Sequence, residues 1–304
     1  MELTNVIENI SNDFDNKSKT STKTISGINT NKCNKAIYTC ITGKYDTIIQ
    51  HEYISSDWDY ICFTDNNELL KHKNIGIWQI RMAKKKNFNK TKNARWHKTH
   101  PHVLLPEYEE SIWVDANVNI KTSKLFDILN DKSKNAVLLL PAHYKRNCIY
   151  QECDAVIDSQ NDTVSNVNKA RKFLIKQGMP SNFGMNETNI IYRKHKNIKV
   201  INLMEQWYKC INKYSKRDQL SWTYVLWKNN IDINKITIPN ARIDKDNYDI
   251  VNHKNKKLCT KKTKITWASF FKNIITVKKE NMRIIITVLG IKFKFKNKEH
   301  IVRN

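Results

Sequence analysis

Between residues 36 and 230 of the 304-residue chain, short runs rich in β-branched and aromatic residues alternate with segments of helical periodicity. Because strands and helices must each bury an apolar side against another element, this alternation predicts an α/β sheet with helices on its faces. We predict strands at residues 36–41, 60–64, 75–80, 111–114, 136–140 and 189–192, and helices at residues 92–104, 123–129, 164–177, 200–214 and 219–228.

The flanks of this region differ from it in composition. Residues 1–34 are rich in Asn, Ser, Thr and Lys and have little periodicity, so we expect a flexible N-terminal segment. No linker rich in Gly, Ser or Pro interrupts residues 35–250, which predicts one domain there. Residues 251–304 carry 15 basic and two acidic residues, more than half of the net charge of +24. We therefore expect a basic, β-rich tail that meets an anionic surface, although a general drift towards Lys, Asn and Ile would explain part of this charge.

Composition also excludes several classes of protein. With 40% hydrophobic residues the chain can bury a core, which excludes wholesale disorder. It has no apolar run of 18 residues, and its first residues lack the basic and apolar regions of a signal peptide. We expect a cytoplasmic protein that is at most peripheral to a membrane. Seven cysteines without a Cys-x-x-Cys pair fit neither a disulfide framework nor a zinc site.

Polar residues follow the predicted strands at their carboxyl ends, where ligands bind in sheets of this type. Residues 42–46 follow the first strand, and Thr64 and Asp65 end the second. Asp115 and Asn117 follow the fourth strand, 111–114. Their carboxylate and amide oxygens are hard ligands suited to Mg²⁺ or Mn²⁺. The alternative is a turn in which such a side chain caps its own backbone.

A predicted helix upstream carries a cluster of cations. Arg95 and Lys98 are three residues apart, so they share one helix face that could grip a diphosphate. The alternative is a basic helix face in water. The nearby His97, His100 and His102 lack the spacing of four residues that two helical metal ligands need, so we do not expect a metal there.

Further carboxylates lie downstream. Asp218 and Gln219 stand at the start of a predicted helix, where Asp218 would be an N-cap or, alternatively, a carboxylate presented to a sugar hydroxyl or to a reacting carbon. Gln219 would supply an amide donor and acceptor beside it. Glu187 opens a predicted strand and would bring another carboxylate to the same rim, although a plain loop explains it equally well.

Ten motifs follow one another in a recognisable order. They are YTCITGKYD at residues 38–46, DYICFTD at 59–65, RWHK at 95–98, PHVLLPEY at 101–108, SIWVDAN at 111–117, RNCIYQE at 146–152, GMP at 178–180, ETN at 187–189, RKH at 193–195 and YSKRDQLS at 214–221. This succession resembles a family of plant Golgi glycosyltransferases that includes the mucilage-related and turgor-regulation-defect proteins. It departs from that family at Asn117, where many transferases have a second Asp, and at residues 143–146 (HYKR), where the family has His-Pro-x-Arg.

The resemblance implies a single A-type glycosyltransferase domain, which is the Rossmann-like nucleotide-diphospho-sugar transferase fold. Such an enzyme would move a hexose from a nucleoside diphosphate sugar to a glycan or glycolipid hydroxyl, with Mn²⁺ or Mg²⁺ as cofactor. The implied roles are metal binding for Asp115 and Asn117, nucleoside contact for Thr39, Gly43, Tyr45 and Asp65, donor-phosphate contact for Arg95 and Lys98, and an acceptor-side catalytic position for Asp218 and Gln219. An inverting enzyme would need a carboxylate base, for which Asp218 and Glu187 are the candidates, whereas relatives with an Asp-Gln pair are often retaining.

The tail has a separate resemblance. TVKKEN at residues 276–281 and IIITVLGIKFKFK at 284–296 are similar to a short C-terminal module behind bacterial surface-polysaccharide glycosyltransferases. Ile291, Phe293 and Phe295 alternate with lysines, so a strand here would have one apolar and one cationic face. Such a strand suits an anionic membrane surface. An edge hairpin that is protected by its lysines explains the pattern equally well.

Two other functions compete with glycosyl transfer. The positive charge and the 10% aromatic content would suit a non-catalytic nucleic-acid-binding protein. No RNA-recognition or zinc-finger signature supports it, and residues 33–250 carry 23 acidic against 34 basic residues, so we expect no nucleic-acid partner. A lipid-processing, ceramidase-like enzyme is disfavoured because the chain lacks a Gly-x-Ser-x-Gly elbow and a zinc-type histidine pair.

Overall fold

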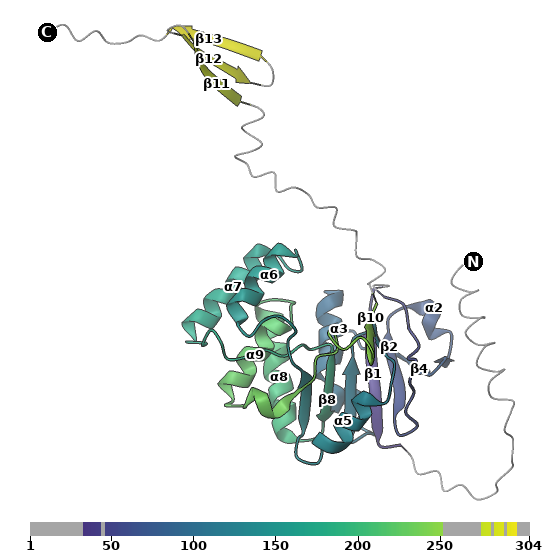
Figure 1. Cartoon of the computed structure of the whole chain (residues 1–304). Coiled ribbons are helices and arrows are strands. Elements are labelled where there is room, and N and C mark those ends of the chain that lie inside the picture. The colour runs from purple at the N-terminus through teal and green to yellow at the C-terminus, as the bar shows by residue number, and fades with distance from the viewer. Residues whose placement is uncertain (1–32, 44–45, 252–274, 281–282, 289–290, 297–304) are drawn as a thin grey trace, which may run out of the picture. The chain divides into compact units, whose positions relative to one another are not determined.

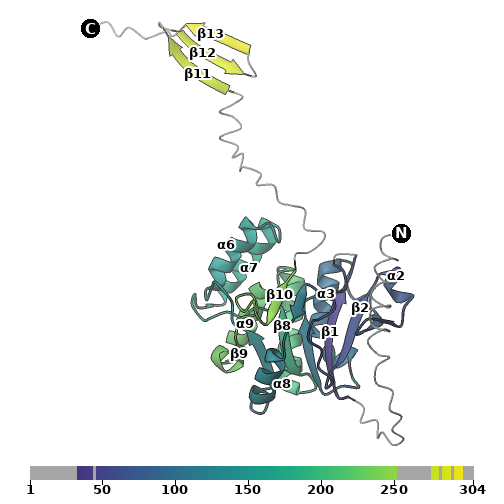
Figure 2. The same cartoon turned by 45° about the vertical axis from the view of Figure 1, so that its right-hand side comes forward.

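The computed structural model describes residues 33–43, 46–251, 275–280, 283–288 and 291–296. Its larger compact unit is built on an eight-stranded sheet with the order β3-β4-β2-β1-β5-β8-β7-β9 (Figures 1 and 2). The strands are β1 (Lys35–Ile41), β2 (Asp59–Thr64), β3 (Asn74–Ile75), β4 (Trp78–Met82), β5 (Glu110–Val114), β7 (Leu138–Pro141), β8 (Ile190–Lys194) and β9 (Thr237–Ile238), and a separate antiparallel pair comprises β6 (Val118–Ile120) and β10 (Tyr248–Ile250).

The direction of the strands decides which loops meet. β2 and β5 flank β1 in parallel, β4 is parallel to β2, and β8 runs antiparallel to β5. The carboxyl ends of the parallel strands and the amino end of β8 therefore share one edge of the sheet. The Asp115 amide after β5 donates to the Asn189 carbonyl before β8 at 2.8 Å, which ties the two segments together at this edge.

Helices cover both faces of the sheet, because successive strand residues point to opposite sides. On β1, Tyr38 belongs to a core that includes residues of α3, α6, α8 and α9, whereas its neighbour Ile37 belongs to a second core that includes residues of α5. The helices are α2 (Asn67–Leu70), α3 (Lys90–Thr99), α4 (Pro101–Leu104), α5 (Lys124–Lys132), α6 (Ile149–Asp158), α7 (Val164–Lys176), α8 (Ile198–Lys213) and α9 (Gln219–Lys228), followed by the 3-10 helix η1 (Ile233–Ile236).

This arrangement confirms the predicted α/β class, with differences in particular elements. The predicted strand 75–80 is two antiparallel strands, β3 and β4, separated by a turn at Gly76, whose φ of +56° favours glycine. The predicted helix 92–104 is divided into α3 and α4 at Pro101, which lacks the amide hydrogen that a continuous helix needs. Helix α6 was not predicted, although Ile149, Cys153 and Val156 have helical spacing and are buried.

The C-terminal unit contains a three-stranded antiparallel sheet of β11 (Ile275–Glu280), β12 (Arg283–Val288) and β13 (Ile291–Lys296). Consecutive strands pair in register, with Ile275 opposite Val288 and Arg283 opposite Lys296. The β-rich character predicted for the tail is confirmed in these strands. Its predicted membrane contact stays a prediction, and the predicted N-terminal segment lies almost entirely outside the described residues.

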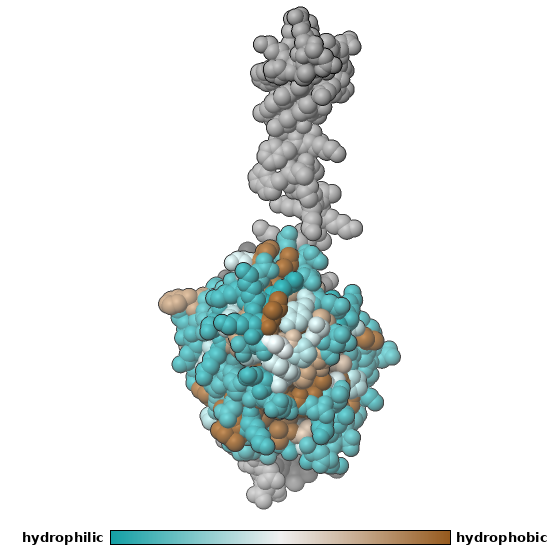
Figure 3. Space-filling view, turned by 90° about the vertical axis from the view of Figure 1, so that its left-hand side faces the viewer, coloured by the Kyte–Doolittle hydropathy of each residue, from teal (hydrophilic) through white to brown (hydrophobic). Residues whose placement is uncertain are grey.

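Figure 3 shows one face of the larger unit. Seen from the side on which α7 and α9 lie in Figure 1, this surface is largely hydrophilic, with small separate hydrophobic areas (Figure 3). No helix in the described part of the chain is both long enough and apolar enough to cross a membrane.

Candidate functional site

A cleft of about 460 Å³ opens at the edge where the parallel strands end and β8 begins. This volume falls within the usual range of small-molecule sites. Residues after β1 and β5, residues of α3, and the segments that precede β8 and α9 form its walls. The basic and acidic residues that line it are Lys90, Arg95, Lys216, Arg217 and Arg242, and Asp46, Asp115, Glu187 and Asp218.

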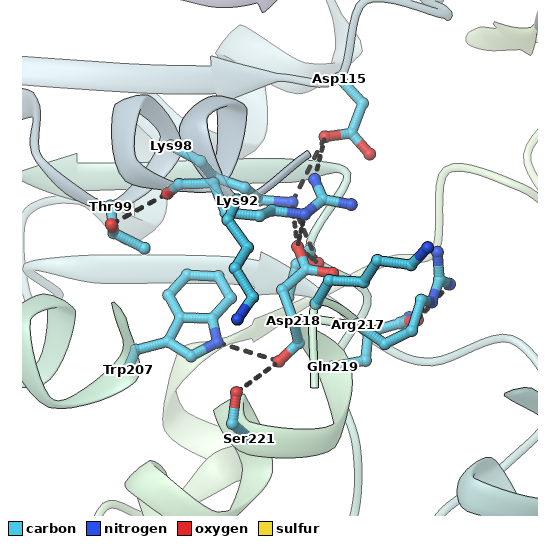
Figure 4. Close-up of polar contacts among 12 residues, drawn as sticks. Lys92, Lys98, Thr99, Asp115, Trp207, Arg217, Asp218, Gln219 and Ser221 are labelled. Atoms are coloured by element: carbon cyan, nitrogen blue, oxygen red, sulfur yellow. Dashed lines mark hydrogen bonds and ion pairs between the residues drawn. The ribbon is translucent and has the colours of Figure 1, made fainter. Parts of the chain in front are cut away.

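A buried lysine, which does not itself line the cleft, forms ion pairs with two of the acidic residues that do. Lys98 Nζ lies 2.7 Å from Asp218 Oδ2 and 3.3 Å from Asp115 Oδ1, so it links the carboxylates that follow β5 and precede α9 (Figure 4). Lys98 is 0% exposed and Asp218 is 2% exposed. Thr188 adds a third contact, because its Oγ1 accepts from Lys98 at 3.1 Å and donates to Asp218 at 3.0 Å.

Several cations act on Asp218. Burial alone would raise its pKa, but the charges of Arg95, Lys98 and Arg217 and the hydrogen bond from Lys98 hold it well below its ordinary value. Arg95 Nε lies 3.4 Å from Asp218 Oδ2. Burial lowers the pKa of Lys98, while Asp115 and Asp218 act in the opposite direction. Asp218 is therefore an ionised carboxylate in a cationic setting.

The backbone at the start of α9 positions Asp218. Asp218 occupies the N-cap position, but its side chain makes no capping hydrogen bond there. Instead, its carbonyl accepts from Trp207 Nε1 at 2.9 Å and from Ser221 Oγ at 3.2 Å (Figure 4). The carboxylate is thus turned towards Lys98. The alternative of a basic helix face in water is wrong for Lys98, which is fully buried, whereas contact with donor phosphates stays a prediction for Lys98 and Arg95.

Asp115 and Asn117, the predicted metal ligands, both line the cleft. Asp115 Oδ1 accepts from Trp113 Nε1 at 2.7 Å, and its carbonyl accepts from the Val118 amide in a turn. Asn117 Nδ2 donates to the Val251 carbonyl at 2.9 Å. Within the described ranges, no group of three His, Cys, Asp or Glu residues could hold a metal by itself. The donor set of one carboxylate and one amide oxygen fits an ion that takes its other ligands from water and substrate phosphates.

Glu187 presents a second buried carboxylate to the cleft. Arg242 Nε donates to its two oxygens at 2.9 and 2.8 Å. Burial raises the pKa of Glu187, and the charges of Arg242 and His143 only partly offset this effect. Glu187 is therefore shifted in the direction opposite to Asp218.

The predicted nucleoside contacts occupy different positions. Gly43 lines the cleft with φ of +69°, and its amide donates to Asp65 Oδ1 at 2.7 Å, so Asp65 shapes this turn. Thr39 is buried in β1 and lines a small neighbouring cavity.

Gln219, which was predicted on the acceptor side, lines the cleft, and its Oε1 accepts from Arg217 at 3.3 Å. Tyr45 lies outside the described residues, and the ligand contacts of all these residues stay predictions.

Three residues for which no site role was predicted also belong here. Asn189 lines the cleft, is buried, and has no hydrogen-bond partner for either amide atom among the described residues. Arg193 is fully buried and donates to the Lys98 carbonyl and to Tyr38 Oη, both at 2.6 Å, which fixes the end of α3. Arg242 pairs with Glu187. Asn189 and Arg193 lie within the sequence motifs. The polarity of their side chains, however, does not predict that Asn189 lacks a hydrogen-bond partner among the described residues or that Arg193 donates to the backbone of a distant helix.

Comparison with known proteins gives further evidence. A protein-family model described as TOD1/MUCI70, glycosyltransferase-like domain, matches residues 12–241. No curated protein matches the chain. Among solved structures, the chain is similar to the bifunctional glycosyltransferase WbbM in its apo form, with a TM-score of 0.41, 11% identity, and coverage of 71% of this chain and 40% of that chain. It therefore spans less than half of WbbM.

Two further solved structures are similar to this chain. Mouse xyloside xylosyltransferase 1 in its apo form has a TM-score of 0.38 and 11% identity, with coverage of 67% of this chain and 84% of that chain. The mannosyltransferase Ktr4p from S. cerevisiae has a TM-score of 0.36 and 13% identity, with coverage of 64% of this chain and 66% of that chain.

Proposed function

This chain belongs to the TOD1/MUCI70 glycosyltransferase-like domain family, from which we infer that it is a glycosyltransferase. We propose that it moves a hexose from a nucleoside diphosphate sugar to a glycan or glycolipid hydroxyl. One observation carries this proposal. A single cleft combines five basic residues with two buried carboxylates, Asp218 and Glu187, whose pKa values are shifted in opposite directions. Such a cleft has the charges that departure of a diphosphate requires.

The departing diphosphate carries negative charge that the enzyme must stabilise. Lys90, Lys216 and Arg217 line the cleft, and no carboxylate within the described ranges forms an ion pair with them. Arg217 lowers the pKa of Asp218 by its charge but makes no ion-pair contact with it, so the three cations can still act on a ligand in the cleft. We assign them to the phosphates, because fixed cations aimed at developing negative charge lower the barrier.

Asp115 and Asn117 are the residues that would hold Mn²⁺ or Mg²⁺. The ion, when bound, supplies additional positive charge at the diphosphate. We expect Asp115→Ala to lower the rate of transfer by about a hundredfold, by analogy with the loss of one charge-stabilising contact. A folded Asp115→Ala variant with wild-type turnover and unchanged Mn²⁺ dependence would contradict this assignment.

The opposite pKa shifts suggest separate roles for the two buried carboxylates. Asp218 stays ionised, which suits a carboxylate that faces positive charge developing at the reacting carbon. Glu187 has a raised pKa, which suits a general base that takes the proton of the acceptor hydroxyl. Asn189 offers an amide to a sugar hydroxyl, since neither of its polar atoms has a protein partner among the described residues.

A thermal-shift panel of nucleotide sugars with and without Mn²⁺ tests the proposal. A ligand that binds only the folded protein stabilises it by about 2.7 kcal/mol at a hundred times its Kd. We expect one nucleotide sugar to raise Tm in the presence of Mn²⁺, and Asp115→Ala to lose this response. If no nucleotide sugar raises Tm while an oligonucleotide binds with steep salt dependence, the chain is a nucleic-acid-binding protein and the proposal is wrong.

A further inference from the structure

The connection between β4 and α3 has an unusual composition. From Glu68 to Glu107 the intervening sequence contains ten basic residues and no acidic one. The middle of this stretch reads MAKKKNFNK at residues 82–90, which joins the last residue of β4 to the first residue of α3. We call residues 82–90 the β4–α3 segment. Positive charge alone is common in a solvated loop. The exposure of its apolar residues therefore decides whether the β4–α3 segment is a binding surface.

Two large apolar side chains of this segment lie in water. Phe88 is 92% exposed and Met82 is 71% exposed, the highest values among the large hydrophobic residues of the described part of residues 33–251. Lys84, Lys85, Lys86 and Lys90 are exposed around them, and Lys85 Nζ lies 4.9 Å from the centre of the Phe88 ring. Single exposed apolar residues are common, but two of them among four lysines within nine residues make the β4–α3 segment amphipathic.

The fold holds this segment in place. The Lys84 amide donates to the Nε2 atom of buried His97 at 3.0 Å. The amides of Lys86 and Asn87 both donate to Asn93 Oδ1, at 2.8 and 3.1 Å. Because residues of α3 hold its backbone by hydrogen bonds, the exposure of Phe88 is a consequence of the fold.

The segment also borders the cleft. Lys90, its last residue, lines the cleft, and the Lys90 carbonyl accepts from Thr42 Oγ1 at 3.0 Å. Thr42 follows β1 and lines the cleft as well. A macromolecule or surface that contacted the β4–α3 segment would therefore lie beside the mouth of the cleft.

We propose that the β4–α3 segment is a docking surface for an anionic lipid bilayer. Phe88 and Met82 enter the interfacial region, where apolar side chains leave water, and Lys84, Lys85 and Lys86 contact anionic headgroups. Charge complementarity and the two apolar side chains together favour this partner. A single-stranded nucleic acid would use the lysines and the Phe88 ring, but it would leave Met82 in water and would find no second aromatic residue within residues 82–90 to form a stacking platform. The β4–α3 segment is distinct in sequence from the tail, and this proposal does not depend on the proposed reaction.

Co-sedimentation of the full chain with lipid vesicles tests the proposal. We expect binding to vesicles of phosphatidylcholine with phosphatidylglycerol, and little binding to phosphatidylcholine alone. Phe88→Ser should lower the partition coefficient about tenfold, because the ring no longer leaves water. The matched control is Ile198→Ser, since Ile198 is 66% exposed on α8, outside the β4–α3 segment, and its loss should leave binding unchanged. Every variant retains the basic tail, so a difference between variants reports the β4–α3 segment.

A local readout separates docking from a general change in the protein. In Phe88→Trp, brominated lipids should quench more fluorescence than they quench in the wild type, and Ile198→Trp should show no such excess. Wild-type vesicle binding by Phe88→Ser, or the absence of excess quenching in Phe88→Trp, would overturn the proposal. Oligonucleotide binding that Phe88→Ser weakens, without any vesicle binding by the wild type, would overturn it in favour of nucleic acid.

Discussion

Asp218 and Glu187 are both carboxylates, both buried and both at the cleft, yet their pKa values are shifted in opposite directions. The difference lies in their cations. Lys98, which faces Asp218, is as buried as the carboxylate, and Arg95 adds a second charge 3.4 Å away. The side chain of Arg242, which faces Glu187, is 42% exposed. Water screens the charge of Arg242, so it offsets less of the desolvation of its partner.

The environment of the cation therefore decides the protonation behaviour of the acid. Asp218 is held ionised because its pair is sealed from water on both sides. Glu187 keeps a raised pKa because only the carboxylate is sealed. Removing the buried cation should therefore lower the free energy of unfolding far more than removing the exposed one.

Lys98→Met should therefore cause the largest loss of stability. The methionine side chain matches the length of the lysine stem but leaves the Asp218 carboxylate buried with only part of its positive surroundings. Breaking a buried pair in this way costs about 3–5 kcal/mol. Denaturant unfolding at pH 7 measures the loss, and Lys92→Met on the same helix is the control, because the hydrogen bond of the Lys92 side chain among the described residues is an exposed one to the Asn212 carbonyl.

This destabilisation should also depend on pH. The pKa of Asp218 is depressed in the folded protein, so its contribution to stability is present above the ordinary carboxyl pKa of about 4 and is lost as pH falls below it. The difference between Lys98→Met and the wild type should thus shrink in acid. The double variant with Asp218→Asn should also recover stability relative to Lys98→Met. A loss below about 1 kcal/mol at pH 7 would show that the pair does not hold this site together.

Asp218→Asn should have the next largest effect, and it should act on catalysis. The amide oxygen of asparagine still accepts from Lys98, and Asp115 remains 3.3 Å from Lys98, so we expect the protein to fold, but the negative charge that we assign to the reacting carbon is lost. We expect donor binding to persist while transfer falls by at least about a hundredfold. Turnover and thermal shift with the donor measure the two quantities separately. A collapse of donor affinity with unchanged turnover would assign Asp218 to donor binding.

The comparison also shows what the sequence could predict about this site. Asp115 and Gly43 follow strands whose β pattern is local and strong, and the carboxyl ends of parallel strands meet at one edge. Both residues accordingly line the cleft where they were expected. Helical spacing likewise placed Arg95 and Lys98 on one face of α3, and both reach the same carboxylate.

Local sequence patterns could not predict which side chains of distant segments pair with each other. Lys98 meets Asp218 across 120 positions, and Glu187 meets Arg242 across 55. Helical spacing defines a face of α3, but only the packing of that face decides that Lys98 is sealed from water. The sequence motifs thus located the carboxylates, while their opposite pKa shifts arise from tertiary contacts that no motif encodes.

Glu187→Gln should lower transfer by about a hundredfold at neutral pH, which is within the usual contribution of a general base. A base acts only when it is deprotonated, so the rate of the wild type should rise with pH through the raised pKa of Glu187. The glutamine variant should lack this acidic limb. The pH profile of the turnover rate checks the prediction, and a variant that retains the limb would place the base elsewhere.

Arg242→Gln should have the smallest effect on the rate, below about fivefold at neutral pH, because a partly exposed ion pair contributes about 1 kcal/mol or less. Its diagnostic effect is on the pH profile. Since the charge of Arg242 lowers the pKa of Glu187, its removal should raise that pKa further and move the acidic limb to higher pH. Arg81→Gln, which breaks a comparable pair with Glu107, should leave the limb in place. A limb that moved to lower pH, or did not move, would mean that Arg242 does not control the protonation of Glu187.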